Sequence, residues 1–382
     1  MTNRFEDAKP TPCKSPETLP PLPIIDWSSI GHTAPTIIEL GDPSKHDPLP
    51  SADIVIITWT AAEWSALDHV FLNSDKERHL TSTTFHKEWH LRSYSKFIKG
   101  AYYLWGYYRM VKIKNSNGDE LSVLLFKSSA HLAHPPFCEG LMSMVKVIIS
   151  EVKPNKLYTI GTAGGSSLSE KLGDTVITNA GHISIKKSQN AECKLNGRNV
   201  ACQNWFPAFD LIPTVEEKLL FKLSEVVTED ELNYMLCKAI HDPQKGDPKW
   251  EGTITVADLQ NAAIDPANLS SPKALNKKGV PLLTTDYYFI ANGDDADQYS
   301  ALEMDDSVIG LVAGEMDTDY VFVRNISDPI VPDKKKDGSP INIKLREGWS
   351  GQIYESFGIY SSMNGALLTW ATIAGDPNKT SS

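Results

Sequence analysis

The sequence predicts an α/β fold, in which a central mixed, largely parallel sheet is the middle of three α/β/α layers. Short continuous apolar runs such as Ile54-Val55-Ile56-Ile57 indicate strands that are buried on both faces. Segments with helical spacing of apolar residues lie between these runs, and this alternation is typical of parallel sheets covered on both sides. At 382 residues, the chain is long enough for a single large domain with insertions.

The elements can be placed in chain order from these patterns. After the strand at 54–57, Trp64, Leu67 and Phe71 recur at helical spacing, so we expect a helix from about Ala61. The further predicted elements are strands 102–114 and 121–127, a helix 137–151, strands 157–160 and 175–178, a helix 214–227, a strand 282–285, a helix 300–312, a strand 320–323 and a helix 350–373.

Three parts of the chain lie outside this pattern. Residues 1–50 are rich in Pro, Ser and Thr and are predicted to form an extension that lies on the domain or on a partner. Its pieces 24–27 and 37–40 are apolar enough to dock on one or the other. The domain then covers residues 51–375, with its insertions concentrated at 185–280, and residues 376–382 form a tail.

The composition argues against several classes of protein. A net charge of −11 does not suit a general nucleic-acid binder, which needs a basic surface to displace counterions. No apolar run has the length of a membrane span, and the N-terminus lacks the apolar core of a signal peptide. The 5 cysteines and 10 histidines are dispersed without metal-ligand spacing, so we expect reduced thiols in the cytoplasm and no metal site.

A glycine-rich segment, Gly161-Thr162-Ala163-Gly164-Gly165, follows a predicted strand. Glycines let the backbone approach a ligand, and consecutive amides can face an anion or a hydroxyl, although an ordinary tight turn has the same composition. The segment is neither a Walker A loop nor a dinucleotide fingerprint.

Acidic residues stand at three positions where elements are expected to begin or end. Glu303-Met304-Asp305 opens a predicted helix, where acids also favour the positive helix end. Asp328 follows 23 residues after Asp305 at a predicted strand end, where Asp is also a common turn former. Thr60 and Glu63 match a capping box.

Taken together and in this order, these motifs resemble the nucleoside phosphorylase and nucleosidase superfamily. They are most similar to its hydrolases of the methylthioadenosine/S-adenosylhomocysteine nucleosidase type, and the resemblance covers roughly residues 52–375. It implies an enzyme that cuts the N-glycosidic bond of a small purine nucleoside or nucleotide without a cofactor. It also implies a homo-oligomer, either a dimer or a hexamer.

The resemblance assigns a role to each motif. Asp328 protonates the purine at N7, and Glu63 takes the proton from the attacking water. Met304 lies under the ribose, and Asp305 stands where most members have the glutamate that binds the ribose hydroxyls. Tyr288 stacks on the base with Phe289 beside it, and Thr162 lines the water side with the Gly164 and Gly165 amides. The substrate-binding residues implied in this way are Thr162, Gly164, Gly165, Tyr288, Phe289, Glu303, Met304 and Asp305.

Two segments favour hydrolysis over phosphorolysis. Phosphorylases of the superfamily carry phosphate-binding arginines in the first loop and just before the glycine-rich loop, whereas this chain has Thr58-Trp59-Thr60 and Tyr158-Thr159-Ile160 there. An aspartate at position 328 is favoured within the family for bases that accept a proton at N7, such as adenine.

A basic stretch after Asp328 leaves the substrate class open. Lys334, Lys335, Lys336 and Arg346 form either a solvated loop or a phosphate clamp for a nucleotide, which Lys186-Lys187 could join. A nucleotide substrate would suit an effector that depletes adenine nucleotides in bacterial antiphage defence. A phosphorylase with a non-standard phosphate site stays an alternative, as does a catalytically silent nucleotide-binding sensor, which Asp305 in place of glutamate suggests.

Overall fold

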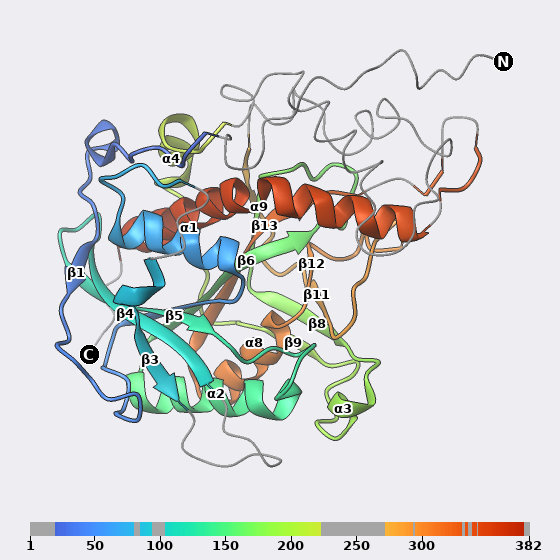
Figure 1. The fold of residues 1–382 in the computed structure, drawn as a ribbon, viewed down its shortest axis with the longest axis horizontal. Helices are drawn as coiled ribbons and strands as arrows, with labels where there is room; N and C mark the ends of the chain where they lie inside the picture. The colour runs from blue at the N-terminus through green and yellow to red at the C-terminus, as the bar shows by residue number, and fades with distance from the viewer. Residues whose placement is uncertain are drawn as a thin grey trace.

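The computed structural model describes residues 20–79, 85–93, 104–222, 272–292, 295–330, 333–334, 338–341 and 343–377. They form a mixed sheet with helices on both faces, as the sequence predicted (Figure 1). None of the helices within these ranges is long and apolar enough to cross a membrane.

Parallel strands form the centre of the sheet. β2 (Ile54–Thr58) pairs with β5 (Glu120–Ser128) on one side and with β6 (Lys156–Gly164) on the other, and β6 pairs in turn with β13 (Asp319–Asp328). All three of these pairings are parallel. The carboxyl ends of the central strands therefore meet at one edge, which is where ligands bind in sheets of this kind.

Antiparallel strands extend the sheet beyond β5. β4 (Leu104–Lys114) pairs with β5, and both β1 (Thr36–Ile38) and β3 (His90–Ser93) pair with β4. The strands beyond β6 and β13 are shorter. They are β7 (Thr175–Thr178), β8 (Ala180–Ser184), β9 (Asn199–Ala201), β10 (Ala274–Asn276), β11 (Leu282–Thr285) and β12 (Leu302–Glu303).

Helices cover both faces of the sheet. α1 (Ala61–Leu72) and the long α9 (Ile343–Ala374) pack on one face, and α2 (Phe137–Val152) and α8 (Asp306–Glu315) pack on the other (Figure 1). The shorter helices are α3 (Ser188–Ala191), α4 (Ile212–Lys218) and the 3-10 helices Trp27–Ile30 and Phe85–Glu88.

Strand alternation explains why the central strands are apolar throughout. In β2, Ile54 and Ile56 belong to the apolar cluster under α1 and α9, while Val55 and Ile57 belong to the cluster under α2 and α8. Successive side chains of a strand point to opposite faces, so a strand covered on both sides has no solvent-facing position. This confirms the interpretation of the continuous apolar runs as buried strands.

Three predicted boundaries differ from the structure. The helix expected at 300–312 begins only at Asp306, because residues 302–303 pair as a strand with Gly164 and with β11. The helix expected at 214–227 runs from Ile212 to Lys218. The closing helix begins at Ile343 rather than at residue 350.

The part of the N-terminal segment that the structure describes packs onto the domain. Leu22 is fully buried and forms a bridge with Arg78, and β1 adds residues 36–38 to the sheet. Trp27 is buried against Trp370, with ring centroids 4.5 Å apart, and its Nε1 donates to Ser74 Oγ at 2.9 Å. The two apolar pieces predicted to dock do so.

The predicted tail also begins with a bound residue. Asp376 is buried, and its carboxylate accepts a hydrogen bond from Lys156 Nζ at 2.6 Å. Asn115 Nδ2 donates to the Asp376 carbonyl at 3.3 Å. The ordered domain therefore extends to at least this residue.

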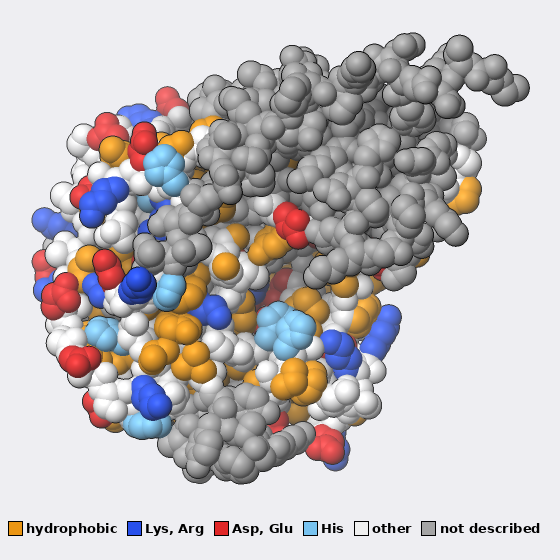
Figure 2. All heavy atoms as spheres, in the orientation of Figure 1, with side chains coloured by type: hydrophobic (Ala, Val, Ile, Leu, Met, Phe, Trp, Pro, Cys, Tyr) orange, Lys and Arg blue, Asp and Glu red, His pale blue; other side chains and the backbone are white. Residues whose placement is uncertain are grey.

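On the face shown in Figure 2, Lys and Arg side chains are interspersed with Asp and Glu, and the described part of this face carries no continuous basic patch. This mixture suits a protein whose net charge is −11, and it is unlike the basic stripe of a nucleic-acid interface.

Replacing Trp27 with alanine tests the contribution of the N-terminal segment to stability. We expect Trp27→Ala to lower the free energy of unfolding by about 3–5 kcal/mol, because a buried indole, its packing on Trp370 and one hydrogen bond are lost. Urea unfolding followed by circular dichroism measures this change. Ile24→Ala is the matched control, since Ile24 is 57% exposed and its truncation should change the free energy by less than about 0.5 kcal/mol. Equal effects of both variants would show that the segment is not part of the core.

Candidate active site

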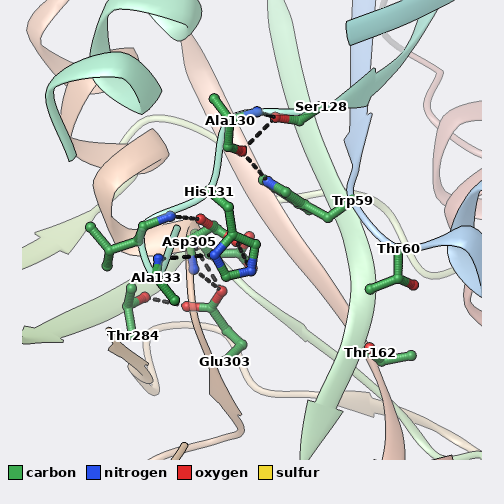
Figure 3. Close-up of polar contacts among 12 residues, drawn as sticks. Trp59, Thr60, Ser128, Ala130, His131, Ala133, Thr162, Thr284, Glu303 and Asp305 are labelled. Carbon is green, nitrogen blue, oxygen red and sulfur yellow. Dashed lines mark hydrogen bonds and ion pairs between the residues drawn. The ribbon is translucent and has the colours of Figure 1, made fainter. Parts of the chain in front are cut away.

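Most of the predicted catalytic and sugar-binding residues lie where β2, β6 and β13 end and where α1 and α8 begin. Thr162, Glu303 and Asp305 are drawn among them in Figure 3. Gly161 to Gly164 lie inside β6 rather than in a loop after it, because β13 pairs with β6 as far as Gly164. The glycine-rich segment is therefore the end of a strand between two other strand ends. Side chains from both neighbours can approach it closely.

Glu63 is buried, with 1% of its surface exposed, and its carboxylate is fully hydrogen-bonded. The capping box with Thr60 is present in both directions. Oε1 accepts from the Thr162 amide and from Thr162 Oγ1, both at 2.7 Å. Oε2 accepts from Thr58 Oγ1, Trp59 N and Thr60 N at 2.8–3.1 Å. The Glu63 carboxylate thus caps α1 and also binds Thr162 at the end of β6.

Gly161 is required by the close approach of two charged groups. A Cβ at this position would overlap Nη1 of Arg324 and lie 3.0 Å from Glu63 Oε1. Any larger residue would separate these groups from β6 or displace them.

Arg324 is a buried residue of the site that the sequence analysis did not single out. It lies on β13 with 4% of its surface exposed. Its guanidinium pairs with Asp306, donating from Nε to Oδ2 at 2.7 Å and from Nη2 to Oδ1, and Nη2 lies 3.3 Å from Glu303 Oε2. Its Cζ lies 5.0 Å from the centre of the Trp59 ring. A lone arginine inside an apolar strand was the available signal, since buried charges are kept only with partners.

Glu303 organises the segment that follows it. Its Oε2 accepts from the amides of Asp305 at 2.6 Å and Asp306 at 2.9 Å, and Oε1 accepts from Thr284 Oγ1. Burial, with the Asp306 carboxylate as the second cause, raises the pKa of Glu303 to about 8. Glu303 is therefore a positioning group for Asp305 and for the start of α8, while the neighbouring Met304 is half-buried.

Asp305 is held by the loop that follows β5. The Leu132 amide donates to Oδ1 at 2.8 Å, and His131 Nε2 lies 3.4 Å from Oδ2 (Figure 3). Burial raises the pKa of Asp305 to about 8. His131 was missed by the sequence analysis, because nothing in the local pattern around it indicates a partner so distant in the chain.

Asp328 ends β13, as predicted, and hydroxyl groups surround its carboxylate. Ser327 Oγ donates to Oδ1 at 2.6 Å, Ser350 Oγ donates to Oδ2 at 3.0 Å, and Tyr288 OH lies 3.4 Å from Oδ2. Burial raises the pKa of Asp328 above its ordinary value, although these hydroxyls oppose the shift. A Cβ at Gly164 would lie 3.2 Å from Oδ2, so glycine lets this carboxyl lie against β6.

Two predicted roles change with the structure. The Gly165 amide was expected to face the water side of the site, but it donates to the Asp328 carbonyl at 3.0 Å and so fixes the strand end. Arg346 was a candidate for a phosphate clamp, but it is 5% exposed and its Nη2 donates to the Ala291 carbonyl. Burial accordingly lowers the pKa of Arg346.

Of the predicted aromatic and basic site residues that the structure describes, only Tyr288 makes a polar contact with Asp328. Tyr288 is 51% exposed beside Asp328, and Phe289 packs on a small apolar cluster that includes Leu283, Leu302 and Ile330. Lys334 is exposed, and Lys335 and Lys336 lie outside the described residues. Lys187 Nζ donates to the Ala133 carbonyl at 2.8 Å, and Lys186 Nζ lies 3.7 Å from the centre of the Tyr287 ring.

The structure thus brings together Glu63, Thr162, Asp305 and Asp328 around the end of β6, and it adds Arg324 and His131 to them. Within the described ranges, no group of three or more His, Cys, Asp or Glu side chains is arranged to hold a metal ion.

Comparisons with known proteins give matches among solved structures. No protein-family model matches the chain, and no curated protein matches it. The 5'-methylthioadenosine/S-adenosylhomocysteine nucleosidases of Neisseria meningitidis and S. pneumoniae are both 12% identical, with a TM-score of 0.41, and each match covers 84% of this chain and 98% of the other. Futalosine hydrolase of Helicobacter pylori is 10% identical, with a TM-score of 0.40, covering 83% of this chain and 96% of the other. At this level of similarity, the assignment of function depends on the residues of this chain.

Proposed function

We propose that the protein is a purine N-glycosidase that hydrolyses the bond between base and sugar. The observation that carries this proposal is the placement of two acids, the buried Glu63 and the half-buried Asp328, against one strand end. Glu63 binds Thr162 and Asp328 lies against Gly164, two residues further along β6. Residues two apart in a strand face the same side, about 7 Å apart, so a water molecule and a sugar ring could lie between the acids.

Asp328 is suited to the role of general acid. A purine anion is a poor leaving group, so protonation of the base as the bond breaks lowers the barrier. Burial raises the pKa of Asp328, which favours the protonated form that this step needs. The ring of Tyr288 stands beside the carboxyl, half exposed, where it could stack on a bound base.

We assign the deprotonation of water to Glu63, where the water would replace one of its five donors, such as the Thr162 hydroxyl. Its carboxylate is fixed by the donors of the capping box and of Thr162, so its orientation does not change when substrate binds. Preorganisation of this kind is a large part of enzymatic rate enhancement. The Thr162 hydroxyl, which donates to Glu63, would define one side of the water position.

The sugar would lie beside Asp305 and the half-buried Met304. Cleavage of an N-glycosidic bond develops positive charge on the sugar, and nearby carboxylates stabilise that charge. Asp305 and Glu63 come from opposite sides of the site, α8 and α1, and could both act on this charge.

The contacts of two basic candidates support a nucleoside substrate. Arg346 is buried away from any clamp, and Lys187 is bound to the Ala133 carbonyl. The preference for adenine follows from the aspartate at position 328 and the family resemblance. A role in depleting adenine nucleotides rests on the remaining basic residues, of which only Lys334 is described, and so it stays a prediction.

Base release without phosphate is the direct test. We expect purified protein to release adenine from adenosine in phosphate-free buffer, measured by chromatography beside inosine, AMP, ATP and NAD. Asp328→Asn should abolish release because the acid is lost, and Glu63→Gln should reduce it by about 10²-fold or more. Glu139→Gln is the matched control, since Glu139 is also a first-turn helix acid but is exposed.

The other outcomes separate the alternatives. Release that requires phosphate and yields ribose 1-phosphate would show a phosphorylase and remove Glu63 from its role. Faster release from AMP or ATP than from adenosine would establish a nucleotide substrate. Tight nucleotide binding without release of base would show a sensor.

The pH dependence of turnover tests the role of Asp328. The acid must be protonated, so kcat should fall as pH rises through its raised pKa. Ser350 stabilises the charged form, so Ser350→Ala should raise this pKa and move the falling limb to higher pH. Ser362→Ala, a buried position further along α9, should leave the limb unchanged. A shift of the limb to lower pH in Ser350→Ala would contradict the assignment.

A further inference from the structure

The loop after β5 presents a histidine to the sugar side of the site. His131 has 24% of its side chain exposed, while the Asp305 side chain beside it has 4%. Figure 3 shows the imidazole next to the carboxyl of Asp305, with Glu303 below it in this view. The sequence gives no hint of this contact, since β5 and α8 are far apart in the chain.

The hydrogen bonding fixes which nitrogen of His131 carries the proton. The Ala133 amide donates to Nδ1 at 2.9 Å, so Nδ1 is an acceptor and the neutral ring carries its hydrogen on Nε2. Burial lowers the pKa of His131 to about 4, so the neutral ring predominates at pH 7. Nε2–H is therefore a donor beside Asp305.

Among the described residues, this donor has only a long contact. Nε2 lies 3.4 Å from Asp305 Oδ2, which is longer than an ordinary N–H···O hydrogen bond. The Leu132 amide already donates to the other carboxyl oxygen at 2.8 Å. Asp305 and His131 thus offer one acceptor and one donor side by side.

We propose that His131 and Asp305 form a donor–acceptor pair that recognises the vicinal diol of the sugar, with His131 as a specificity-determining residue. One hydroxyl donates to Asp305, and the neighbouring hydroxyl accepts from His131 Nε2–H. An aspartate is one methylene shorter than a glutamate, and this leaves room for the histidine. The proposal rests on the proposed function and deepens it, because it limits the substrate to a riboside with both hydroxyls.

The loop has anchors besides the bond from the Ala133 amide to His131 Nδ1, so it does not depend on the His131 side chain alone. Asn190 Nδ2 donates to the Leu132 carbonyl at 3.0 Å, and Lys187 Nζ donates to the Ala133 carbonyl at 2.8 Å. Asn190 Nδ2 is also bound to Asp286 at 2.9 Å. We therefore expect variants at position 131 to keep the fold.

The test compares adenosine with its 2'-deoxy and 3'-deoxy analogues. The kcat/KM for base release is measured for the wild-type protein, His131→Ala and His131→Gln. We expect the wild type to prefer adenosine, and His131→Ala to lower the preference over at least one deoxy analogue by about tenfold. His131→Gln keeps an amide donor and should retain part of the preference. His134→Ala is the control on the same loop, since His134 is exposed, with its ring 5.1 Å from that of His131.

The pattern across substrates decides the outcome. If His131→Ala slows all three substrates equally, the residue is only structural and the proposal is overturned. The affinities of the same three ligands are also measured by equilibrium binding. If the wild-type protein releases no base, the proposed hydrolase is refuted, but the binding data still test the role of His131. In that case, a preference for the intact diol that disappears in His131→Ala supports the pair. Equal affinities for all three ligands overturn it.

Discussion

The ion pair of Arg324 with Asp306 is the interaction on which the site depends. Both residues are buried, and Glu303 approaches the same guanidinium. Two carboxylates removed from water would each cost several kcal/mol without a cation between them. The guanidinium also stacks on Trp59, so the loop after β2, the start of α8 and the strand β13 are held as one unit.

The other acids of the site are held by dipoles instead of by a cation. Hydroxyls and amides donate to Glu63, an amide donates to Asp305, and hydroxyls donate to Asp328. Such partners fix the position of a carboxyl without neutralising its charge. Burial raises the pKa of Asp305 to about 8 and so disfavours its charged form. Positive charge on the sugar would offset this penalty, and the carboxylate would then bind the transition state more strongly than the ground state.

The fold and some residues of the candidate site could be predicted from the sequence. Whether a residue could be predicted depends on whether its partners are local in the chain. The strand at residues 54–57 was predictable because burial on both faces leaves a continuous apolar run. Glu63 stood out through its local spacing to Thr60, whereas Arg324 and His131 depend on partners from other elements. The helix that corresponds to α8 was predicted to begin at residue 300, before its actual start at Asp306. Strand pairing at residues 302–303 overrides the local helical spacing there.

The burial of Arg346 could not be predicted from the sequence. A basic residue near others is normally solvated, and the charge pattern carries no information on burial. The structure places its guanidinium against the Ala291 carbonyl, where it ties the start of α9 to the segment after β11. The charge pattern therefore did not reveal that this guanidinium binds a backbone carbonyl of the same chain.

The distribution of charge around the site also bears on the choice between water and phosphate as the attacking group. Of the cations described near it, Arg324 is paired with Asp306, Lys187 donates to a carbonyl, and Lys127 donates to Ser129 Oγ at 3.5 Å and is electrostatically attracted to Glu63. Phosphate would bring further negative charge next to Glu63 and Asp305. Phosphate would therefore meet repulsion and the cost of its desolvation unless a cation such as Lys127 exchanged its partner for it. Neutral water meets neither cost, and this supports the proposed hydrolysis.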